Sequence, residues 1–556
     1  MTVAQDDRPI LSHRQILLLM AGLMTGMLLA ALDQTIVGTA LPTIVGELGG
    51  ITHYSWVVTA YLLASTASTP LYGKISDLLG RRPVFLFSIV TFLIGSLLAG
   101  LSQNMAQLII TRGIQGLGAG GLMTLAFTII SDVVSPRERG RYQGLFGAVF
   151  GLSSVAGPLV GGYFAETNWR WIFYINIPLG LLAIVVCYRV MRMVPFQRRK
   201  HAIDWIGAVL LVVWVSCLLL ALSWGGNEYA WSSPTIIGLF AGGAVLAVVF
   251  LIQEARVGEP ILPLHLFRRP TFALANIAGF VLGLVMFGSI IFIPLYLQIV
   301  KGASPTRSGL LMLPMMAGVI VMSVLSGRAM SRFGRYKWFP VAGSVVLLVG
   351  MLLFTQLEVR TSLWLAFAFM VIIGIGMGLC MQSLILAVQN AVEARDLGAG
   401  TSAATFFRSL GGSFGVAILG AVLTARLNSG LAERLPGALA QLPPEQATAV
   451  GGAGNISINE PEKILALPEP VRVAIQESFV GSLHLVFLVT GLITILAVVV
   501  TVLLPDRELR GAGPQGAAGG VGPAGGKAPA PGGKPLDKAT KEEAASEMEA
   551  QSQTML

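Results

Sequence analysis

One acidic residue lies deep inside an apolar stretch of this sequence. Asp33 falls within residues 16–38, a run long enough to cross a bilayer. A carboxylate at that depth costs roughly 2.5–3.5 kcal/mol on insertion scales, so it is a functional candidate by default. Gly22, Gly26 and Ala30 precede it at helical spacing, so the helix face that carries Asp33 can line a packed or water-filled interior.

Arg112 is the basic residue that matches Asp33. It lies about six residues from the outer start of the run 106–131, and Asp33 lies about five residues from the outer end of its own run, so at about 1.5 Å per residue the two depths are similar. Two interpretations stay open. The residues form a permanent structural ion pair, or Asp33 exchanges a proton because burial favours its neutral form while Arg112 favours its charged form.

The elements that must position this pair are membrane helices. The 556 residues are 54% hydrophobic and only 12% charged, with a mean hydropathy of +0.76, which excludes a soluble globular enzyme and a disordered chain. We expect an all-α polytopic membrane protein with fourteen transmembrane helices. The apolar runs are 16–38, 54–72, 84–101, 106–131, 143–165, 171–191, 203–222, 234–252, 272–296, 309–330, 338–356, 362–388, 401–426 and 479–504.

The net charge of +9 is concentrated in the loops on one side of the membrane. Arg81 and Arg82 lie in one such loop, and Arg137, Arg139 and Arg141 lie in another. The opposite short loops hold only Arg170, Lys301, Arg307 and Arg360. Because basic loops stay inside, we expect a multi-pass protein of the cell membrane with both termini cytoplasmic, and no nucleic-acid partner.

A faint repeat suggests two halves. GKISDLLGRRP (73–83) and GRAMSRFGRYK (327–337) share glycines at Gly73 and Gly327 and at Gly80 and Gly334. The loops are equivalent only if two helices are inserted between two six-helix bundles. The predicted domains are a cytoplasmic N-terminus (1–15), an N-terminal bundle (16–191), a linker with two inserted helices (192–271), a C-terminal bundle (272–504) that includes a polar extracytoplasmic loop (427–478), and a disordered cytoplasmic tail (505–556).

Other polar residues in the apolar runs are weaker candidates. Arg408 is a second buried charge with no acid obvious at its depth, for which we expect a structural role. Gln34, Gln115 and Gln298 could contact a substrate or bind neighbouring helices together. The sequence contains no phosphate-binding loop, no ion-selectivity filter and no catalytic motif of hydrolases, and its three cysteines have no metal-ligand spacing. We therefore expect no enzyme activity, no metal and no cofactor.

Six segments together resemble the major facilitator superfamily, and within it the fourteen-helix branch of drug:proton antiporters. The likeness covers about residues 14–504. The segments are LDQTIVGTALP (32–42), GKISDLLGRRP (73–83), LIITRGIQGLGAG (108–120), GAVFGLSSVAGPLVGG (147–162), WRWIFYINIPLG (169–180) and PLYLQIVKGASPTRSGLLMLP (294–314). The resemblance implies the major facilitator fold, with two six-helix halves and two inserted helices.

The resemblance also implies roles for particular residues. Asp33 and Arg112 would couple transport to protons. A conformational latch would use Gly73, Lys74, Asp77, Gly80, Arg81 and Arg82. The helix 5 motif of antiporters would comprise Gly151, Gly157, Pro158, Gly161 and Gly162. Glycines there permit close helix approach, and the proline kinks the helix at the seam between halves.

The expected function is a monomeric, proton-coupled exporter of lipophilic small molecules that works by alternating access. Its partners would be the bilayer, the substrate and protons, and the proton gradient would supply the energy. Relatives that export dications carry a further acid in helix 10 or 13, which is absent here, so neutral, zwitterionic or monocationic substrates are favoured. The alternatives are export of a lipid, siderophore or cell-wall precursor on the same fold, and a scaffold that uses the tail 511–556.

Overall fold

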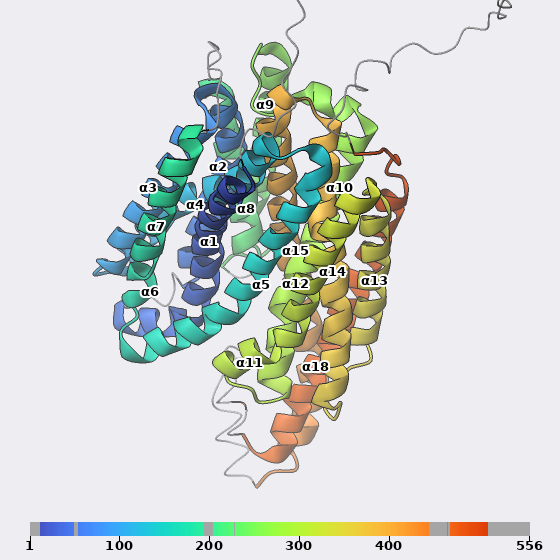
Figure 1. The fold of residues 1–556 in the computed structure, drawn as a ribbon. Coiled ribbons are helices and arrows are strands. Elements are labelled where there is room, and N and C mark those ends of the chain that lie inside the picture. Colours follow the sequence, from blue (N-terminus) through green and yellow to red (C-terminus); the bar gives the residue numbers. More distant parts are fainter. Residues whose placement is uncertain are drawn as a thin grey trace, which may run out of the picture. The chain divides into compact units, whose positions relative to one another are not determined.

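The computed structural model describes residues 12–48, 54–193, 204–226, 228–443, 464 and 467–509, and its described part is almost entirely helical (Figure 1). Contacts divide the chain into Met1–Ala512 and Gly513–Leu556, and all described residues belong to the first of these units. Most of the helices are long and run side by side (Figure 1). This arrangement satisfies the backbone hydrogen bonds within each helix, as a hydrocarbon environment requires.

The N-terminal half is built from helices α1 to α7, and two of their ends show why the chain breaks there. Gly80 separates α2 from α3 with φ 102°, a conformation that favours glycine, and Asn104 caps α4 by accepting from the backbone N–H of Gln107 at 2.9 Å. The helices are α1 (His13–Leu48), α2 (Tyr54–Leu79), α3 (Arg81–Gly100), α4 (Met105–Val133), α5 (Pro136–Thr167), α6 (Trp171–Tyr174) and α7 (Asn176–Val190), followed by a 3-10 turn, η2 (Met191–Met193).

The inserted pair consists of α8 (Trp205–Trp224) and α9 (Pro234–Arg256), each with a side-chain N-cap, from Asp204 and Ser233. The helix α8 packs against α2 and α15 as well as against α9. Its apolar side chains, such as Leu211 and Val215, belong to the same buried cluster as those of the C-terminal helices. Outward-facing Val245 and Val248 on α9 are exposed, as expected for a surface in lipid.

The C-terminal half contains the remaining helices. They are α10 (Pro270–Leu295) with the π-helix η4 (Tyr296–Val300), α11 (Pro305–Leu311), α12 (Leu313–Phe333), α13 (Trp338–Phe354), α14 (Leu363–Ala391), α15 (Leu397–Leu439) and α18 (Glu469–Val502), with 3-10 turns η3 (Leu264–Arg268) and η5 (Ala394–Asp396). The predicted repeat is visible at one turn, because Gly334 after α12 and Gly80 after α2 both have a positive φ, 70° and 102°.

The count of fourteen membrane spans is supported only in part. Each predicted apolar run falls on a helix, but among the described residues twelve helices are long and apolar enough to cross a membrane. The other two are α2, whose sequence is more polar, and α13, which has 17 residues. The protein is therefore an all-helical multi-pass membrane protein, and fourteen spans remain a prediction.

Three predicted boundaries are wrong. We expected residues 73–79 in a loop. They continue α2 without a break, and Gly73 lies inside the helix. The loop 427–478 is shorter, since α15 extends to Leu439 and α18 begins at Glu469; residues 444–463 fall outside the described part. The predicted tail is ordered at its start: the N–H of Leu509 donates to Gly334 O at 2.8 Å, and residues 510–556 are not described.

Candidate functional site

The two residues that the sequence singled out do meet. Arg112 on α4 donates from Nη1 to Asp33 Oδ2 on α1, and the two side chains form an ion pair. Asp33 is 0% exposed and Arg112 is 1% exposed. A buried carboxylate and a buried guanidinium each cost several kcal/mol alone, so each is tolerable here because the other is present.

Two amides complete the coordination of the carboxylate. Gln115 Nε2 donates to Asp33 Oδ1 at 2.7 Å, and Asn176 Nδ2, at the start of α7, donates to the same oxygen at 3.2 Å. Gln115 Oε1 also accepts from Arg112 at 2.7 Å, so one glutamine contacts both members of the ion pair. Asn176 donates in addition to Ser96 Oγ on α3 at 3.0 Å. The charged form of Asp33 is therefore held by three side chains from two further helices.

The helix α2 fixes the other side of Arg112. The guanidinium lies over the ring of Tyr61, 4.2 Å from its centroid, and Nε donates to Val57 O at 3.4 Å. The hydroxyl of Tyr61 donates to Ala30 O on α1 at 3.0 Å. The arginine is thus held by a cation–π contact as well as by the ion pair.

This arrangement links protonation to structure. If Asp33 gained a proton, its charge would vanish and Arg112 would become a buried cation without a counter-ion, which is costly in an apolar interior. Four helices, α1, α2, α4 and α7, contribute directly to the pair, so relieving that cost requires them to move relative to one another. The site can therefore convert a proton transfer into a rearrangement of the N-terminal half.

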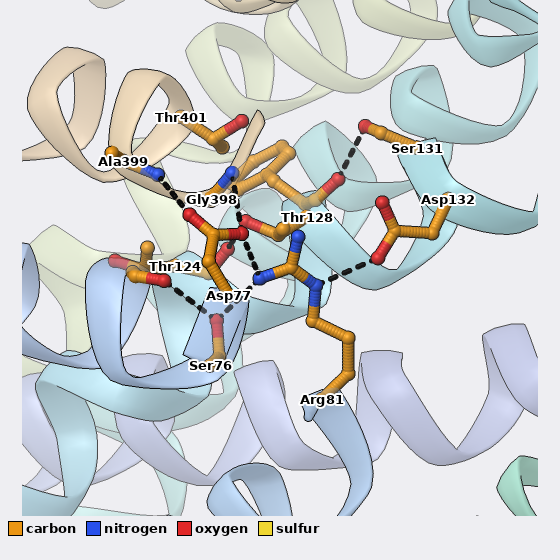
Figure 2. A network of polar contacts seen from close by, with 12 residues as sticks. Ser76, Asp77, Arg81, Thr124, Thr128, Ser131, Asp132, Gly398, Ala399 and Thr401 are labelled. Atoms are coloured by element: carbon orange, nitrogen blue, oxygen red, sulfur yellow. Dashed lines mark hydrogen bonds and ion pairs between the residues drawn. The ribbon is translucent and has the colours of Figure 1, made fainter. Parts of the chain in front are cut away.

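Asp77, from the predicted latch, connects the two halves (Figure 2). Its carboxylate accepts from the backbone N–H groups of Gly398 at 3.2 Å and Ala399 at 3.0 Å, at the first turn of α15. A helix N-terminus has unpaired N–H groups and a partial positive charge, so it binds a carboxylate well. The contact joins α2 of the N-terminal half to α15 of the C-terminal half.

The predicted basic residues of the latch have different partners. Arg81 pairs with Asp77 at 2.5 Å and with Asp132 on α4 at 2.7 Å, and it donates to Ser76 Oγ at 2.6 Å (Figure 2). Lys74 pairs with Glu259, in the segment after α9, at 2.5 Å. Arg82 does not join this network, since its guanidinium lies 4.3 Å from the ring centroid of Tyr188.

The latch glycines act differently from each other. Gly80 forms the turn between α2 and α3, with φ 102°. Gly73 instead allows two helices to approach closely, because a β-carbon there would collide with Ser402 and would lie 2.7 Å from Gly398 O on α15. Gly327, its partner in the repeat, likewise approaches Gly140 on α5.

The helix 5 motif lies between the halves. A β-carbon at Gly157 would collide with Thr35 on α1, and one at Gly161 would lie 2.8 Å from Ile36 O. On the other side, Gly151 faces Ile320 on α12, Gly162 faces Thr306, and Pro158, which lies inside α5, contacts Gly309 on α11. The motif thus packs α5 against α1 and against two helices of the C-terminal half.

The three remaining candidates lie apart from Asp33. Gln34 is half-buried and takes no part in the network around its neighbour. Gln298 donates to Ser308 Oγ at 2.9 Å and so joins η4 to α11. Arg408, on α15, lines a cavity in the C-terminal half, and its Nη1 is buried without a hydrogen-bond partner.

Sequence reasoning missed Asn176, Tyr61 and a clasp at the far end of the N-terminal half. There Glu47 accepts from Trp169 Nε1 at 2.8 Å and pairs with Arg170 at 2.5 Å. The hydrogen bond from Arg170 holds the pKa of Glu47 below its usual value, with help from Trp169. Asn176, Trp169 and Arg170 all lie in WRWIFYINIPLG. This segment resembles the family, but the sequence alone predicts no contact for its residues.

The described ranges contain no group of three or more His, Cys, Asp or Glu side chains that could hold a metal ion. The described Cys187, Cys217 and Cys380 are free.

Comparison with known proteins agrees with this architecture. Multidrug transporter protein MdtP of Bacillus subtilis is 42% identical over 497 residues, which cover 86% of this chain and 91% of that protein. Multidrug resistance protein 3 of Bacillus subtilis is 39% identical over 490 residues, or 87% and 93% of the two chains. The solved proton:xylose symporter XylE shares the fold, with a TM-score of 0.57 and 14% identity over 89% of this chain and 98% of that one.

The family model described as Major Facilitator Superfamily matches residues 23–416, which is most of the membrane region. A member of that family is a transporter rather than an enzyme. Together with relatives of about 40% identity that align over nearly their whole length, this match leaves one conclusion: the chain belongs to the major facilitator superfamily.

Proposed function

We propose that this protein is a proton-coupled exporter of lipophilic small molecules, drugs among them, that works by alternating access between its two halves. The observation that carries the proposal is the fully buried Asp33 carboxylate, tied to Arg112, Gln115 and Asn176. An intramembrane carboxylate with such partners is typical of a proton relay. The names of the two Bacillus relatives, a multidrug transporter and a multidrug resistance protein, support drugs as the substrate class.

In the proposed cycle Asp33 takes a proton from the outside. Neutralisation frees Arg112 and allows α1, α2, α4 and α7 to rearrange, and substrate leaves outward. The proton then leaves toward the cytoplasm, and the ion pair forms again. The energy comes from the proton gradient, without a bound cofactor. The distribution of Lys and Arg in the short loops supports cytoplasmic termini.

The latch has the second role in the proposal. Hydrogen bonds that join the halves gather at the end of the bundle where α2 ends and α15 begins. They include Asp77 to Gly398 and Ala399, Arg137 to Ser331 O at 3.2 Å, and Gln143 to Gln389 at 2.7 Å. We infer that these bonds hold the cytoplasmic end closed and break when the carrier faces inward.

Transport in vesicles of defined orientation tests the proposal. The purified protein is placed in vesicles, a proton gradient is imposed, and a panel of lipophilic molecules is offered while lumenal pH is recorded. We expect proton movement when a substrate is added to the wild type and no such movement with Asp33→Asn. Asp506→Asn, which changes a partly exposed carboxylate far along the chain, is the matched control and should behave as the wild type.

Normal gradient-driven efflux by correctly inserted Asp33→Asn would contradict the proposal. If the wild type moved no protons with any lipophile, broad drug export would be abandoned. The cargo would then be sought among lipids, siderophores and cell-wall precursors.

A further inference from the structure

The C-terminal half contains a cavity that the proton site does not explain. It lies among α10, α14 and α15, and the small residues in its lining are Ala275, Gly279 and Ala404. The larger side chains include Met286 and Met381. Arg408 is the charged residue in this lining.

The guanidinium of Arg408 is incompletely satisfied. Its Nη1 is buried and has no hydrogen-bond acceptor within reach among the described residues. None of the described residues that line the cavity is Asp or Glu. A buried N–H donor without an acceptor is unfavourable, so an acceptor group supplied by a ligand would stabilise Arg408.

The surroundings hold Arg408 in place while leaving the cavity adaptable. A β-carbon at Gly283 on α10 would collide with Arg408 O, so the two helix backbones touch and fix the position of the arginine on α15. The cavity volume is about 20 Å³ in this conformation, enough for roughly one water molecule. Methionine side chains repack easily, so Met286 and Met381 can make room for a larger apolar body.

Charge favours an anionic group over a cationic one here. Asp33 is the buried acid expected to attract a cation, but Arg112 already neutralises it. Arg408 has no counter-ion among the described residues, so the charge available to a ligand in this cavity is positive. An arginine binds a carboxylate through two parallel N–H donors, and an apolar wall accepts the rest of a lipophilic molecule.

We propose that this cavity is a substrate site for lipophilic molecules that carry a carboxylate, with Arg408 binding the carboxylate and Met286 and Met381 moving to admit the apolar body. This inference rests on the proposed export function and names its substrate class. It differs from the expectation that Arg408 has a structural role, and it favours organic anions and zwitterions over simple cations.

Equilibrium binding to the full-length protein in lipid nanodiscs tests the site without any gradient. The probes are pyrenebutyrate, pyrenebutanol and pyrenebutylammonium, which share one apolar body and differ in the head group; empty nanodiscs give the background. For the wild type we expect pyrenebutyrate to bind about tenfold more tightly than either of the other two, as one charge-assisted contact predicts.

Three variants assign the preference to the arginine. Arg408→Met should weaken pyrenebutyrate binding about tenfold and leave pyrenebutanol binding unchanged. Arg408→Lys, which keeps the charge and loses the paired donors, should fall between. Arg426→Met, near the other end of the same helix, is the matched control and should bind like the wild type.

A thermal unfolding scan separates a binding role from a structural one. Removing a charge that has no partner should leave the melting temperature of Arg408→Met equal or higher, whereas a structural arginine would lower it. Unchanged pyrenebutyrate binding in folded Arg408→Met, no pyrenebutyrate binding in the wild type, or a wild-type preference for the ammonium probe would each overturn the proposal.

The two proposals fail separately. Asp33→Asn should keep the pyrenebutyrate preference although it no longer couples to protons. If the preference depends on Arg408 but vesicles show no proton movement, the substrate site stands and proton coupling fails. If protons move with lipophilic cations and the pyrenebutyrate preference is absent, proton coupling stands and the substrate site fails.

Discussion

The two halves differ in how they hold an arginine within a long helix: Arg112 has a counter-ion, and Arg408 has none among the described residues. Arg112 contacts Asp33, Gln115 and Tyr61, whereas Arg408 has a buried nitrogen without an acceptor. The same difference appears where the halves meet. At the equivalent position of the repeat, Asp77 caps α15 with a charge, while the neutral Ser331 accepts from Arg141 N on α5 at 3.0 Å. The N-terminal half thus pairs Arg112 internally, and the C-terminal half leaves Arg408 for the proposed ligand.

This contrast assigns different tasks to the halves. A charge that is paired inside the protein can respond to a proton, because protonation breaks the pair and alters the packing around it. A charge without a partner can respond only to something that enters. We infer that the N-terminal half handles protons and the C-terminal half recognises substrate.

The largest expected effect comes from replacing each arginine with methionine. Arg112→Met leaves the Asp33 carboxylate buried and unpaired, so we expect a loss of about 3–5 kcal/mol in the free energy of unfolding. Arg408→Met should be neutral or stabilising. Thermal unfolding in one detergent measures both, and similar losses for the two variants would remove the contrast between the halves.

A smaller effect is expected at the amides. Asn176→Leu removes the hydrogen bonds to Asp33 and Ser96, so we expect a loss of about 1–3 kcal/mol and slower gradient-driven efflux. Asn276→Leu on α10 is the matched control, because Asn276 donates only within its own helix, to Phe272 O. Equal slowing of efflux by both variants would mean that Asn176 has no special connection with the proton site.

The next smaller effect is expected at the contact between α2 and α15, where Asp77 joins the two halves. Asp77→Asn removes the charge at the N-terminus of α15, an interaction worth about 0.3–1 kcal/mol when exposed and up to about 2 kcal/mol when buried. The population of conformers open at that end should rise, as measured by distances between spin labels on α5 and α12. Ser331→Ala, the neutral counterpart, should change the distances less; a larger change with Ser331→Ala would reverse the comparison of seams.

The smallest expected effect is at the exposed clasp of Glu47 and Arg170. Because the folded-state pKa of Glu47 is lowered, its contribution is present above the ordinary value of 4.5 and is lost as pH falls through the lowered pKa. For a half-exposed pair we expect at most about 1 kcal/mol. Unfolding scans of Glu47→Gln should therefore differ from the wild type at neutral pH and converge with it in acid.

The sequence predicted the pairing of Asp33 with Arg112 because depth in a membrane follows from residue counting along straight helices. Asp33 and Arg112 were assigned similar depths in this way, and the structure brings them into contact. The helix 5 motif and the latch that contains Asp77 came from the resemblance to the major facilitator superfamily, and their residues lie where the halves meet.

Sequence could not predict contacts that depend on how helices pack around one another. Asn176 reaches Asp33 across 143 positions, and Lys74 reaches Glu259 across 185, so neither spacing carries a signal. Helix ends were also missed where a polar sequence continues a helix, as at 73–79 and 427–439, because tertiary contacts stabilise turns that composition disfavours.

The most direct test of the central claim is to observe the proton on Asp33. Infrared difference spectra of the full-length protein in lipid, recorded from neutral to mildly acidic pH, report the carbonyl stretch of a protonated carboxyl group. The account predicts a band that grows on acidification in the wild type and is missing from Asp33→Asn. Identical spectra from the two proteins throughout that range would show that Asp33 stays charged, and the ion pair with Arg112 would then be structural.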